Sequence, residues 1–228
     1  MASCLSSPAL AQDVQCERAL KGAKCTFVDG PVRLTRQPVK IAPEPQDFFR
    51  LEKGLGFRDS AGREWVAPPE TFTDGASIPE IFIPLIGKRR SRTFINAATI
   101  HDAYCGHGNE GLAEYKSRHW EDVHRMFYDA LVVNGTSKTK ARIMFAAVYL
   151  GGPRWGDRSR DMSSVSRTHM VQEMEWCIRW IKRMKPSRER IVDWMKSREA
   201  NLRANTPQEP DWKTLFAEGK SRSKAYAD

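Results

Sequence analysis

The chain has 228 residues, of which 40% are hydrophobic and 10% aromatic, and its formal net charge is +9. This composition excludes an intrinsically disordered protein, and the length suits one globular domain with appendages. No run of residues is long and apolar enough to cross a bilayer as a helix, so the sequence predicts no transmembrane segment.

Residues 1–30 are interpreted as a leader or loop segment. They contain an Ala9-x-Ala11 pattern of the kind that precedes signal-peptidase cleavage, but no charged and apolar region comes before it. The segment is therefore either a truncated signal or no signal at all. Cys16 and Cys25 are close enough in sequence to form a disulfide in an oxidising compartment. We therefore favour a periplasmic or secreted location over the cytoplasm.

Residues 31–155 are predicted to form an α+β core domain that carries the functional site. Two strand-like runs, 48–57 and 64–69, are joined by the turn sequence RDSAGR and predict an antiparallel hairpin. Helical periodicity then predicts three helices, over residues 94–105, about 116–133 and about 137–150. The expected fold is a small antiparallel β-sheet or hairpin packed on a predominantly helical core, with a C-terminal helical extension.

The stretch TFTDGASIPE connects the hairpin to the helices. Asp74 and Gly75 form an Asp-Gly pair, which is typical of a tight turn. Ser77 and Glu80 have capping-box spacing, and Pro79 suits a first helical turn. These structural roles account for nearly every residue except the Asp74 carboxylate, which has a chemical role only if it meets other candidate residues in space.

Residues 156–228 are predicted to form a basic helical extension and tail. Two long amphipathic helices begin near Thr168 and are interrupted at Pro186, and a weakly ordered tail follows Pro207. From Arg154 onward the chain holds 17 Lys and Arg against 11 Asp and Glu. This surplus suits an anionic envelope component or lipid as a partner, or a solvated basic helix face.

Three tryptophans of the extension are candidate stacking groups for nucleic acid: Trp176, Trp180 and Trp194. Their helical spacing favours the other interpretation, in which they pack the extension onto the rest of the protein. We therefore do not expect nucleic-acid binding.

His101 and Asp102 give the sharpest local signal for a functional site. Both have apolar residues three or four positions away on the helix predicted at 94–105, so both are expected to be buried. A buried carboxylate requires a cation, a protonated histidine or several hydrogen-bond donors. Asp102 is thus a candidate metal ligand and His101 a candidate ligand or catalytic base. The alternative is a satisfied polar network within the core.

The second predicted helix supplies further candidates. His119 falls within its apolar arc and His124 at the edge of the arc, whereas Asp122 lies toward solvent. Both histidines are candidate metal ligands, although a histidine on an apolar face is more often a core residue. Together with His101 and Asp102, one of them would complete a two-histidine, one-carboxylate set. Such a set suits a divalent metal ion, calcium or zinc, that keeps open positions for water.

Two features near His101 have alternative interpretations. Cys105 lies one helical turn away, and three interpretations are open for it: a fourth metal ligand, a buried thiol, or one half of a disulfide. The glycine-rich loop at 106–111, which contains His107, is a mobile rim over a site or a plain helix connection. The sequence contains no Gly-x-Ser-x-Gly elbow, no phosphate-binding loop and no His-Glu-x-x-His motif. These absences argue against the commonest hydrolase and nucleotide-binding classes.

Four sequence blocks follow one another between about residues 49 and 155. In order, they are WVAPPETFTDGASIP, AATIHDAYC, HRMFYDALVVNG and AAVYLGGPRW. In order and spacing they resemble domain-of-unknown-function family 1353 of phage and bacterial proteins. The resemblance implies a fold and the convergence of Asp74, His101 and Asp102, but no established activity. The family often carries an aspartate where this chain has His124, so the chain departs there toward an imidazole.

Our leading hypothesis is a metal-dependent hydrolase that acts on a cell-envelope polymer or lipid. Asp102 and His124, or His119, would bind the ion, Asp74 would contribute a second carboxylate, and His101 would deprotonate the attacking water. The alternative is a non-catalytic phage or envelope component in which a buried His-Asp network joins the hairpin to the helices. The sequence leaves open whether the protein is an enzyme.

Overall fold

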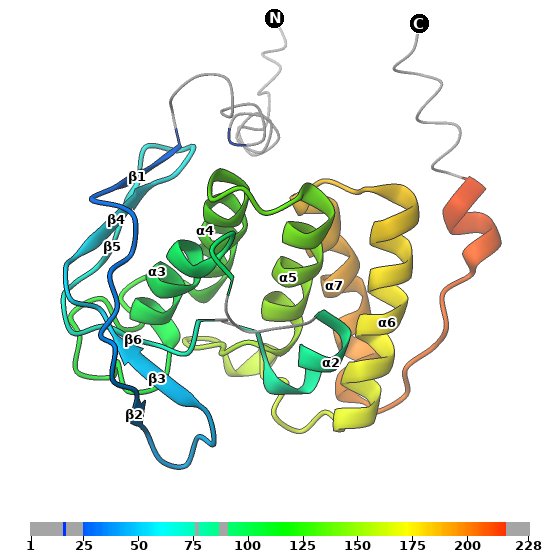
Figure 1. Ribbon diagram of the computed structural model, residues 1–228. Helices are drawn as coiled ribbons and strands as arrows, with labels where there is room; N and C mark the ends of the chain where they lie inside the picture. The colour runs from blue at the N-terminus through cyan, green and yellow to red at the C-terminus, as the bar shows by residue number, and fades with distance from the viewer. Residues whose placement is uncertain (1–15, 17–24, 76–77, 87–90, 218–228) are drawn as a thin grey trace, which may run out of the picture.

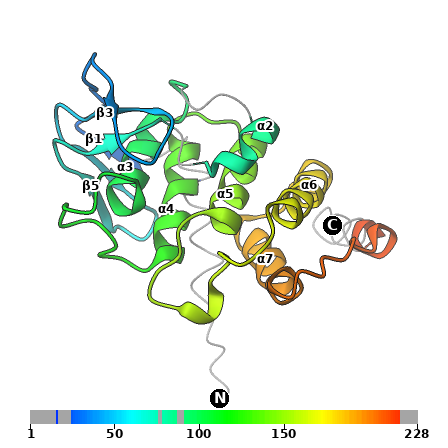
Figure 2. The same ribbon diagram turned by 90° about the horizontal axis from the view of Figure 1, so that it is seen from below.

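The protein has the expected α+β fold in its computed structural model, which describes residue 16 and residues 25–75, 78–86 and 91–217. The longer helices are α3 (Ile95–Cys105), α4 (Trp120–Val133), α5 (Lys138–Gly151), α6 (Arg167–Met184) and α7 (Arg188–Arg203). Two small antiparallel sheets lie at one side of the helices (Figure 1). From below, the sheets come first, then α3 and α4, then α5, and finally α6 and α7 (Figure 2).

Each sheet has three short strands. One sheet has the order β1-β4-β5 and the other the order β2-β3-β6. The strands are β1 (Thr26–Val28), β2 (Val39–Lys40), β3 (Asp47–Arg50), β4 (Leu55–Arg58), β5 (Glu64–Ala67) and β6 (Phe72–Thr73). The predicted hairpin is confirmed as β4 and β5, in which Leu55 pairs with Ala67 and Phe57 with Trp65. These four side chains are buried and form the inner face of the first sheet.

The run predicted as one strand over 48–57 is two strands that belong to different sheets. The first, β3, pairs with β6, and the second, β4, pairs with β1 and β5. Leu51 marks the change, since its N–H donates to the carbonyl of Thr71 and its own carbonyl accepts from Glu70. Period-two alternation continues through such a change of partner, so the pattern alone does not locate the break.

The connection between sheet and helices agrees in part with expectation. Gly75 has a φ of +88°, as the predicted Asp-Gly turn requires. A 3₁₀ turn, η2 (Glu80–Phe82), continues into the short helix α2 (Ile83–Ile86). Pro79 is the N-cap and not a first-turn residue, and no side-chain hydrogen bond caps this end. Ser77, the other member of the predicted capping box, lies outside the described residues.

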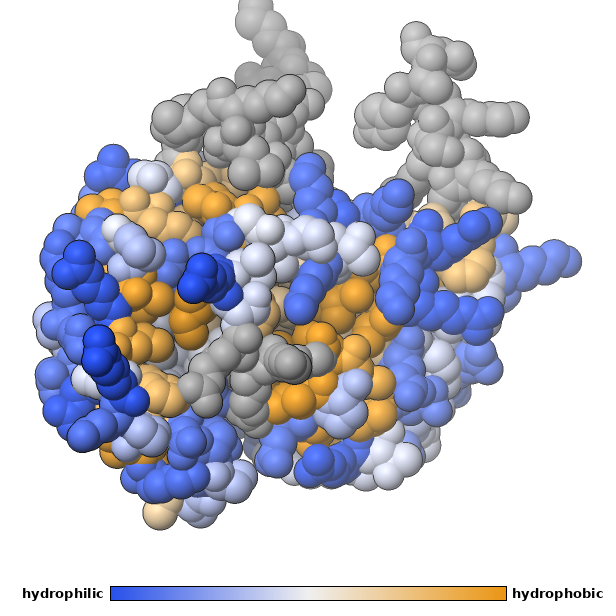
Figure 3. Space-filling model, in the orientation of Figure 1, coloured by the Kyte–Doolittle hydropathy of each residue, from blue (hydrophilic) through white to orange (hydrophobic). Residues whose placement is uncertain are grey.

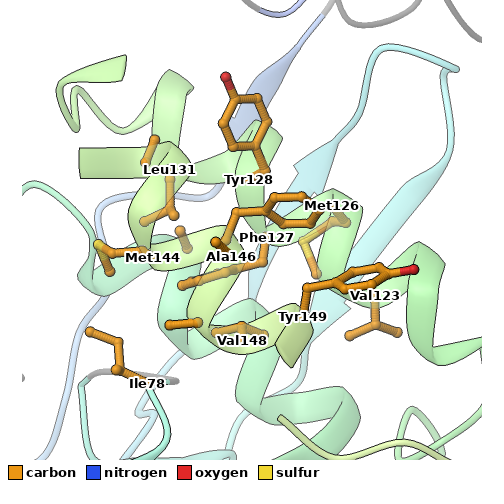
Figure 4. Close-up of a cluster of buried hydrophobic side chains, with 14 of the residues drawn as sticks. Ile78, Val123, Met126, Phe127, Tyr128, Leu131, Met144, Ala146, Val148 and Tyr149 are labelled. Atoms are coloured by element: carbon orange, nitrogen blue, oxygen red, sulfur yellow. The ribbon is translucent and has the colours of Figure 1, made fainter. Parts of the chain in front are cut away.

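The three predicted core helices are confirmed as α3, α4 and α5. Helix α4 begins at Trp120, about four residues later than predicted, because the preceding residue, His119, is its N-cap. Its side chain accepts a hydrogen bond from the Glu121 N–H in place of entering the apolar arc. The core between these helices is rich in aromatic and branched side chains, including Phe127, Tyr149 and their neighbours (Figure 4).

The C-terminal extension is confirmed as two helices, α6 and α7, on either side of Pro186, and both pack against α5. The rings of Trp180 and Trp194 stack between them with centroids 4.6 Å apart, and both side chains are buried. This supports the interpretation that the tryptophans pack the extension. Beyond Pro207, where we predicted a weakly ordered tail, residues 212–217 are helical.

Two expectations about the whole chain are also resolved. Cys16 and Cys25 form a disulfide, with their Cα atoms 5.7 Å apart. Cys105 and Cys177 are free and buried. Among the residues that the structure describes, every helix is too short or too polar to span a membrane.

Candidate functional site

Helix α3 brings His101 and Asp102 to the centre of the molecule. The helix packs against β4, β5 and β6 on one side and against α4 on the other. Because it is covered on both sides, nine consecutive residues from Ala97 to Cys105 are buried, including both polar ones. The predicted burial of His101 and Asp102 is therefore confirmed, and the reason is that α3 lies between two layers.

His101 lies directly against His124 of α4. His101 Nε2 and His124 Nδ1 are 2.9 Å apart, a hydrogen bond between two buried imidazoles. His101 is 2% exposed and His124 is completely buried. The ring of Phe127, one turn along α4, packs against His101 with centroids 4.8 Å apart. The sequence prediction that a histidine of the second helix meets His101 is thus confirmed for His124.

Burial keeps both imidazoles uncharged. Desolvation lowers the pKa of His101 to about 3. The pKa of His124 is also well below its usual value, first because of burial and then because of His101 and the positive charge of Arg154. The nearby backbone of Pro153 acts in the opposite direction and raises the pKa, although His124 Nε2 makes no hydrogen bond to the described residues. At neutral pH each ring carries one hydrogen, and a single hydrogen lies between the two facing nitrogens, so one of them donates and the other accepts.

The second nitrogen of His124 lies against the end of α5. A Cβ on Gly152 would lie 3.3 Å from His124 Nε2 and only 2.3 Å from the Val148 carbonyl oxygen, so only glycine fits here. The same turn continues into Pro153, whose backbone raises the pKa of His124. The end of the block AAVYLGGPRW, which carries part of the family resemblance, therefore also packs against the His124 ring.

A cavity of about 420 Å³ opens beside His101. Its wall contains His101, Asp102 and Cys105 from α3 and Asp74 from the Asp-Gly turn. The chain thus brings Asp74, His101 and Asp102 to one cavity, as the family resemblance implied. The remaining lining residues come from six other stretches of the chain: Glu44, Gln46, Phe48, Ile78, Pro79, Glu80, Gly106, His107, Gly151, Gly152, Pro153, Arg154, Asp161, Met162, Ser163 and Met170.

The cavity wall is rich in acidic groups. Five carboxylates border it, from Glu44, Asp74, Glu80, Asp102 and Asp161. The buried guanidinium in the wall, that of Arg154, is paired with Glu199 at 3.1 Å, and the imidazole of His107 faces Glu44 at 3.3 Å. Acidic residues thus outnumber basic ones among the described residues of the cavity wall.

The other histidine candidate of the second helix does not face the cavity. His119 is exposed, and its Nδ1 accepts from the Glu121 backbone as the N-cap of α4. The prediction that it faces inward is wrong, because the helix begins after it and the periodicity of α4 does not extend to it. Asp122 lies toward solvent, as predicted, and pairs with Arg63 at 3.3 Å.

Cys105 is a buried thiol beside the imidazole of His101. Its Sγ is 3.6 Å from His101 Nδ1 and Nε2. Burial, together with the neighbouring Asp102 charge, raises the pKa of the thiol well above its usual value, so the thiolate is disfavoured. Of the interpretations that the sequence left open, the buried free thiol is the one observed.

The glycine-rich loop after α3 is anchored by Asn109, a residue that the sequence did not single out. Its side-chain amide donates to the carbonyls of Phe72 and Asp102, and its oxygen accepts from the Phe72 N–H. Asn109 is 1% exposed. The loop is thus tied to β6 and to the end of α3, which holds the cavity side of α3 in place.

The metal ligands predicted from the sequence stay a prediction. Across the described ranges, no group of three or more His, Cys, Asp and Glu side chains is arranged to hold a metal ion. His124 does not border the cavity, and its Nδ1 is engaged by His101. Carboxylate oxygens, from Asp74 and Asp102, are what the cavity offers to a cation.

The extension is joined to the core by a buried ion cluster close to this site. Arg160, of the 3₁₀ turn η3 (Arg158–Arg160), donates to Glu199 of α7 through Nε at 2.9 Å and also to Glu121 of α4. Glu121 accepts a further hydrogen bond from the Tyr149 hydroxyl at 3.0 Å. Although burial raises the pKa of Glu121, Arg160 and Tyr149 outweigh it and bring the pKa to about 2.

Comparison with known proteins agrees with the motifs in the sequence. Residues 49–148 match the model of a family described as protein of unknown function (DUF1353). The uncharacterized protein y4iH of Sinorhizobium fredii (strain NBRC 101917 / NGR234) is 42% identical over 106 residues, which are 46% of this chain and 41% of y4iH. The uncharacterized protein y4jT of the same strain is 37% identical over 130 residues, 57% of this chain and 35% of y4jT.

The matched part of the chain thus spans less than half the length of these curated relatives. No solved structure matches the chain.

Proposed function

Taking the DUF1353 segment at residues 49–148 as the frame of the site, we propose that this protein is a hydrolase whose general base is His101. One observation carries the proposal: an uncharged imidazole forms part of a cavity wall and is held in place by a second imidazole. A general base has to be unprotonated at working pH and fixed within reach of the substrate. Burial supplies the first property and His124 the second.

One arrangement of hydrogens suits this role. A hydrogen on His124 Nε2 leaves His124 Nδ1 as the acceptor in the pair. His101 Nε2 then donates to it, and the lone pair of His101 resides on Nδ1, on the side of Cys105. In this arrangement His101 Nδ1 takes the proton from the attacking water. His124 keeps the ring oriented, the role that a second hydrogen-bonded group has in catalytic triads.

Asp74 and Asp102 are the residues that would hold a divalent cation. Carboxylate oxygens together with water suit calcium, which accepts oxygen ligands in flexible geometry, better than they suit zinc. When bound, such a cation lowers the pKa of water and offsets charge that develops on a substrate oxygen. The proposed mechanism needs the cation because an imidazole with a pKa of about 3 is a weak base. Such a base can deprotonate water only if the pKa of the water is lowered.

His124 and His119 have no ligand role in this proposal. The first would have to give up its hydrogen bond to His101, and the second is exposed at the N-terminus of α4. Two carboxylates and water replace the two-histidine set that the sequence favoured.

The substrate class that we propose is an ester or amide of the cell envelope. The Cys16–Cys25 disulfide supports an oxidising compartment, periplasmic or extracellular. The acidic cavity supports a reacting group that carries no negative charge of its own. An anionic part of the substrate or of the envelope would instead meet the basic extension, which has a surplus of Lys and Arg.

The test is hydrolysis of a panel of p-nitrophenyl esters and fluorogenic amides, with calcium, with zinc and with a chelator. His101→Gln should abolish turnover, and Asp102→Asn should abolish the effect of the cation, while both variants remain folded by circular dichroism. His119→Gln is the matched control and should retain the activity of the wild type. A folded His101→Gln variant with unchanged turnover would overturn the proposal.

A second candidate function is a non-catalytic envelope or phage component. The observation in its favour is that the His101–His124 pair and Asn109 tie α3 to α4 and β6, as a purely structural network would. This function predicts no hydrolysis of any panel member by folded wild type. It also predicts no increase in Tm with any cation, and a large loss of stability in His101→Gln.

A further inference from the structure

We infer that the C-terminal extension completes the site by supplying a binding surface for an apolar part of the substrate. The inference rests on the proposed function in one respect, since it takes the His101 end of the cavity as the reacting end. Four residues of the extension border the cavity: Asp161, Met162, Ser163 and Met170. All of them lie beyond residue 148, where the match to the family ends.

The apolar lining gathers where the extension meets the end of α5. A Cβ added to Gly151 would lie 3.4 Å from both the Met170 Cε and the Pro79 Cγ, and 2.9 Å from Phe82. The methionine and the proline therefore approach the same point, where glycine leaves room. Because Pro79 and Met170 both border the cavity, this side of it is apolar.

Methionine suits a surface that binds a ligand. Met162 and Met170 are 8% and 6% exposed, so each presents a small part of its side chain to the cavity. Methionine is flexible and polarizable, and it adapts to ligands of different shape. With the carboxylates and His101 in the same wall, the cavity offers both a polar and an apolar side. A ligand with a polar scissile group and an alkyl or acyl portion fits this division.

The extension is held firmly enough to act as a wall. Arg160, the residue before Asp161, bonds to Glu121 and Glu199 from two different helices. Asp161 accepts from the N–H and the hydroxyl of Ser163 at 2.9 and 2.7 Å. The cavity-lining residues at 161–163 are therefore anchored to the core on one side and by their own turn on the other.

The molecular surface beside this region is also apolar. Figure 3 shows hydrophobic surface around α2 and along its border with α6. The side chains of Ile81, Ile83 and Leu85 are partly exposed there and pack on the core. An alkyl chain that extends beyond the cavity on this side would therefore meet further apolar surface and not the basic face of the extension.

The experiment measures binding and needs no turnover. The full-length protein is labelled at its methionine methyl groups with ¹³C and titrated with N-methyl-, N-butyl- and N-octylacetamide, which are neutral and resist hydrolysis. The signals of Met162 and Met170, assigned with single Met→Leu variants, should shift. The half-saturating concentration should fall by up to about fourfold for each methylene that becomes buried.

Internal and matched controls separate this result from general apolar binding. Met126, Met144 and Met195 are fully buried away from the cavity lining, and their signals should not move. Met170→Gln should weaken octyl binding at least tenfold and leave the methyl compound unaffected. Met184→Gln, on the same helix but not in the cavity wall, should change neither.

Each result bears on one proposal. If Met162 and Met170 do not respond, or if the octyl and methyl compounds bind equally, the inference is overturned. Hydrolysis that depends on His101 but not on chain length would overturn this inference and leave the proposed function intact. Alkyl binding at these methionines without any His101-dependent hydrolysis would leave the binding surface established and overturn the proposed reaction.

Discussion

Two buried polar clusters lie on the same helix, α4, and burial has opposite consequences in them. At the N-terminal turn, Glu121 stays ionised, because Arg160 and Tyr149 outweigh desolvation and hold its pKa at about 2. One turn further on, His124 and its partner His101 are held neutral, because no opposite charge compensates their burial. The charged cluster attaches the extension, whereas His101 of the neutral pair borders the cavity.

The comparison shows that burial alone does not set the charge state of a polar group. Desolvation disfavours ionisation in both clusters, and the presence or absence of a paired counter-charge decides the outcome. A satisfied ion cluster is costly to disturb and suits a structural role. A neutral titratable pair can exchange a proton at neutral pH without breaking an ion pair, which is what catalysis requires. The comparison supports the proposed catalytic role for His101 and a structural role for Arg160.

The largest expected effect is loss of the charged cluster. Arg160→Met should reduce the free energy of unfolding by about 3 kcal/mol or more, because Glu121 and Glu199 would lose a buried partner. Urea unfolding at neutral pH measures it. Arg158→Met, in the same 3₁₀ turn but exposed, is the control and should be nearly neutral. Equal stability of the two variants would contradict the structural role of the cluster.

The second largest effect is expected from loss of Asn109, which anchors the loop beside the cavity. Asn109→Ala removes three side-chain hydrogen bonds and leaves buried backbone groups of Phe72 and Asp102 without that partner. We expect a loss of about 2 kcal/mol. The same urea titration measures it, and faster amide exchange should be confined to β6 and the end of α3. Exchange that rises equally throughout the protein would argue against a local anchor.

The pH dependence distinguishes the neutral pair from the charged cluster. A histidine of pKa 6.5 when unfolded and about 3 when folded takes up a proton on unfolding at any pH between these values. Stability from this group is complete above pH 6.5 and falls as the pH drops toward 3, by about 1.4 kcal/mol per pH unit. His101→Gln should flatten the dependence of the unfolding free energy on pH between pH 6 and 4.5. An unchanged slope would mean that His101 is charged in the folded state.

The smallest effect is expected at the histidine that lies outside both clusters. His119→Ala removes an N-cap hydrogen bond from α4 and should cost about 1 kcal/mol or less. Thermal unfolding measures it. The imidazole NMR signals of His101 and His124 should stay in place. A shift of those signals would show that His119 is coupled to the pair despite its exposure.

Predictions from the sequence succeeded where a local pattern was enough. The Asp-Gly turn at Gly75, the helices from α3 to α7 and the burial of His101 and Asp102 all follow from turn chemistry and helical periodicity. The prediction for His119 failed because the apolar pattern did not reveal where α4 begins. The break between β3 and β4 was missed because alternation continues when a strand changes its partner.

The residues that complete the site were out of reach for the same local reasoning. Asn109 and Met170 have no motif of their own, and each acquires its role from a segment distant in sequence. The GGPRW block was a usable signal, because a Gly-Gly pair at a helix end is one glycine more than termination requires. The close approach of His124 to Gly152 explains why the second residue of this pair is also glycine.

The sequence by itself determined the α+β class, the order of the helices and the candidates His101, Asp102 and Asp74. These depend on composition, spacing and turn chemistry, which act over a few residues. Only the tertiary structure decided that His124 holds His101, that both imidazoles are neutral, and that the extension forms part of the cavity. These depend on desolvation and on contacts between distant segments, and such quantities exist only once the layers have packed.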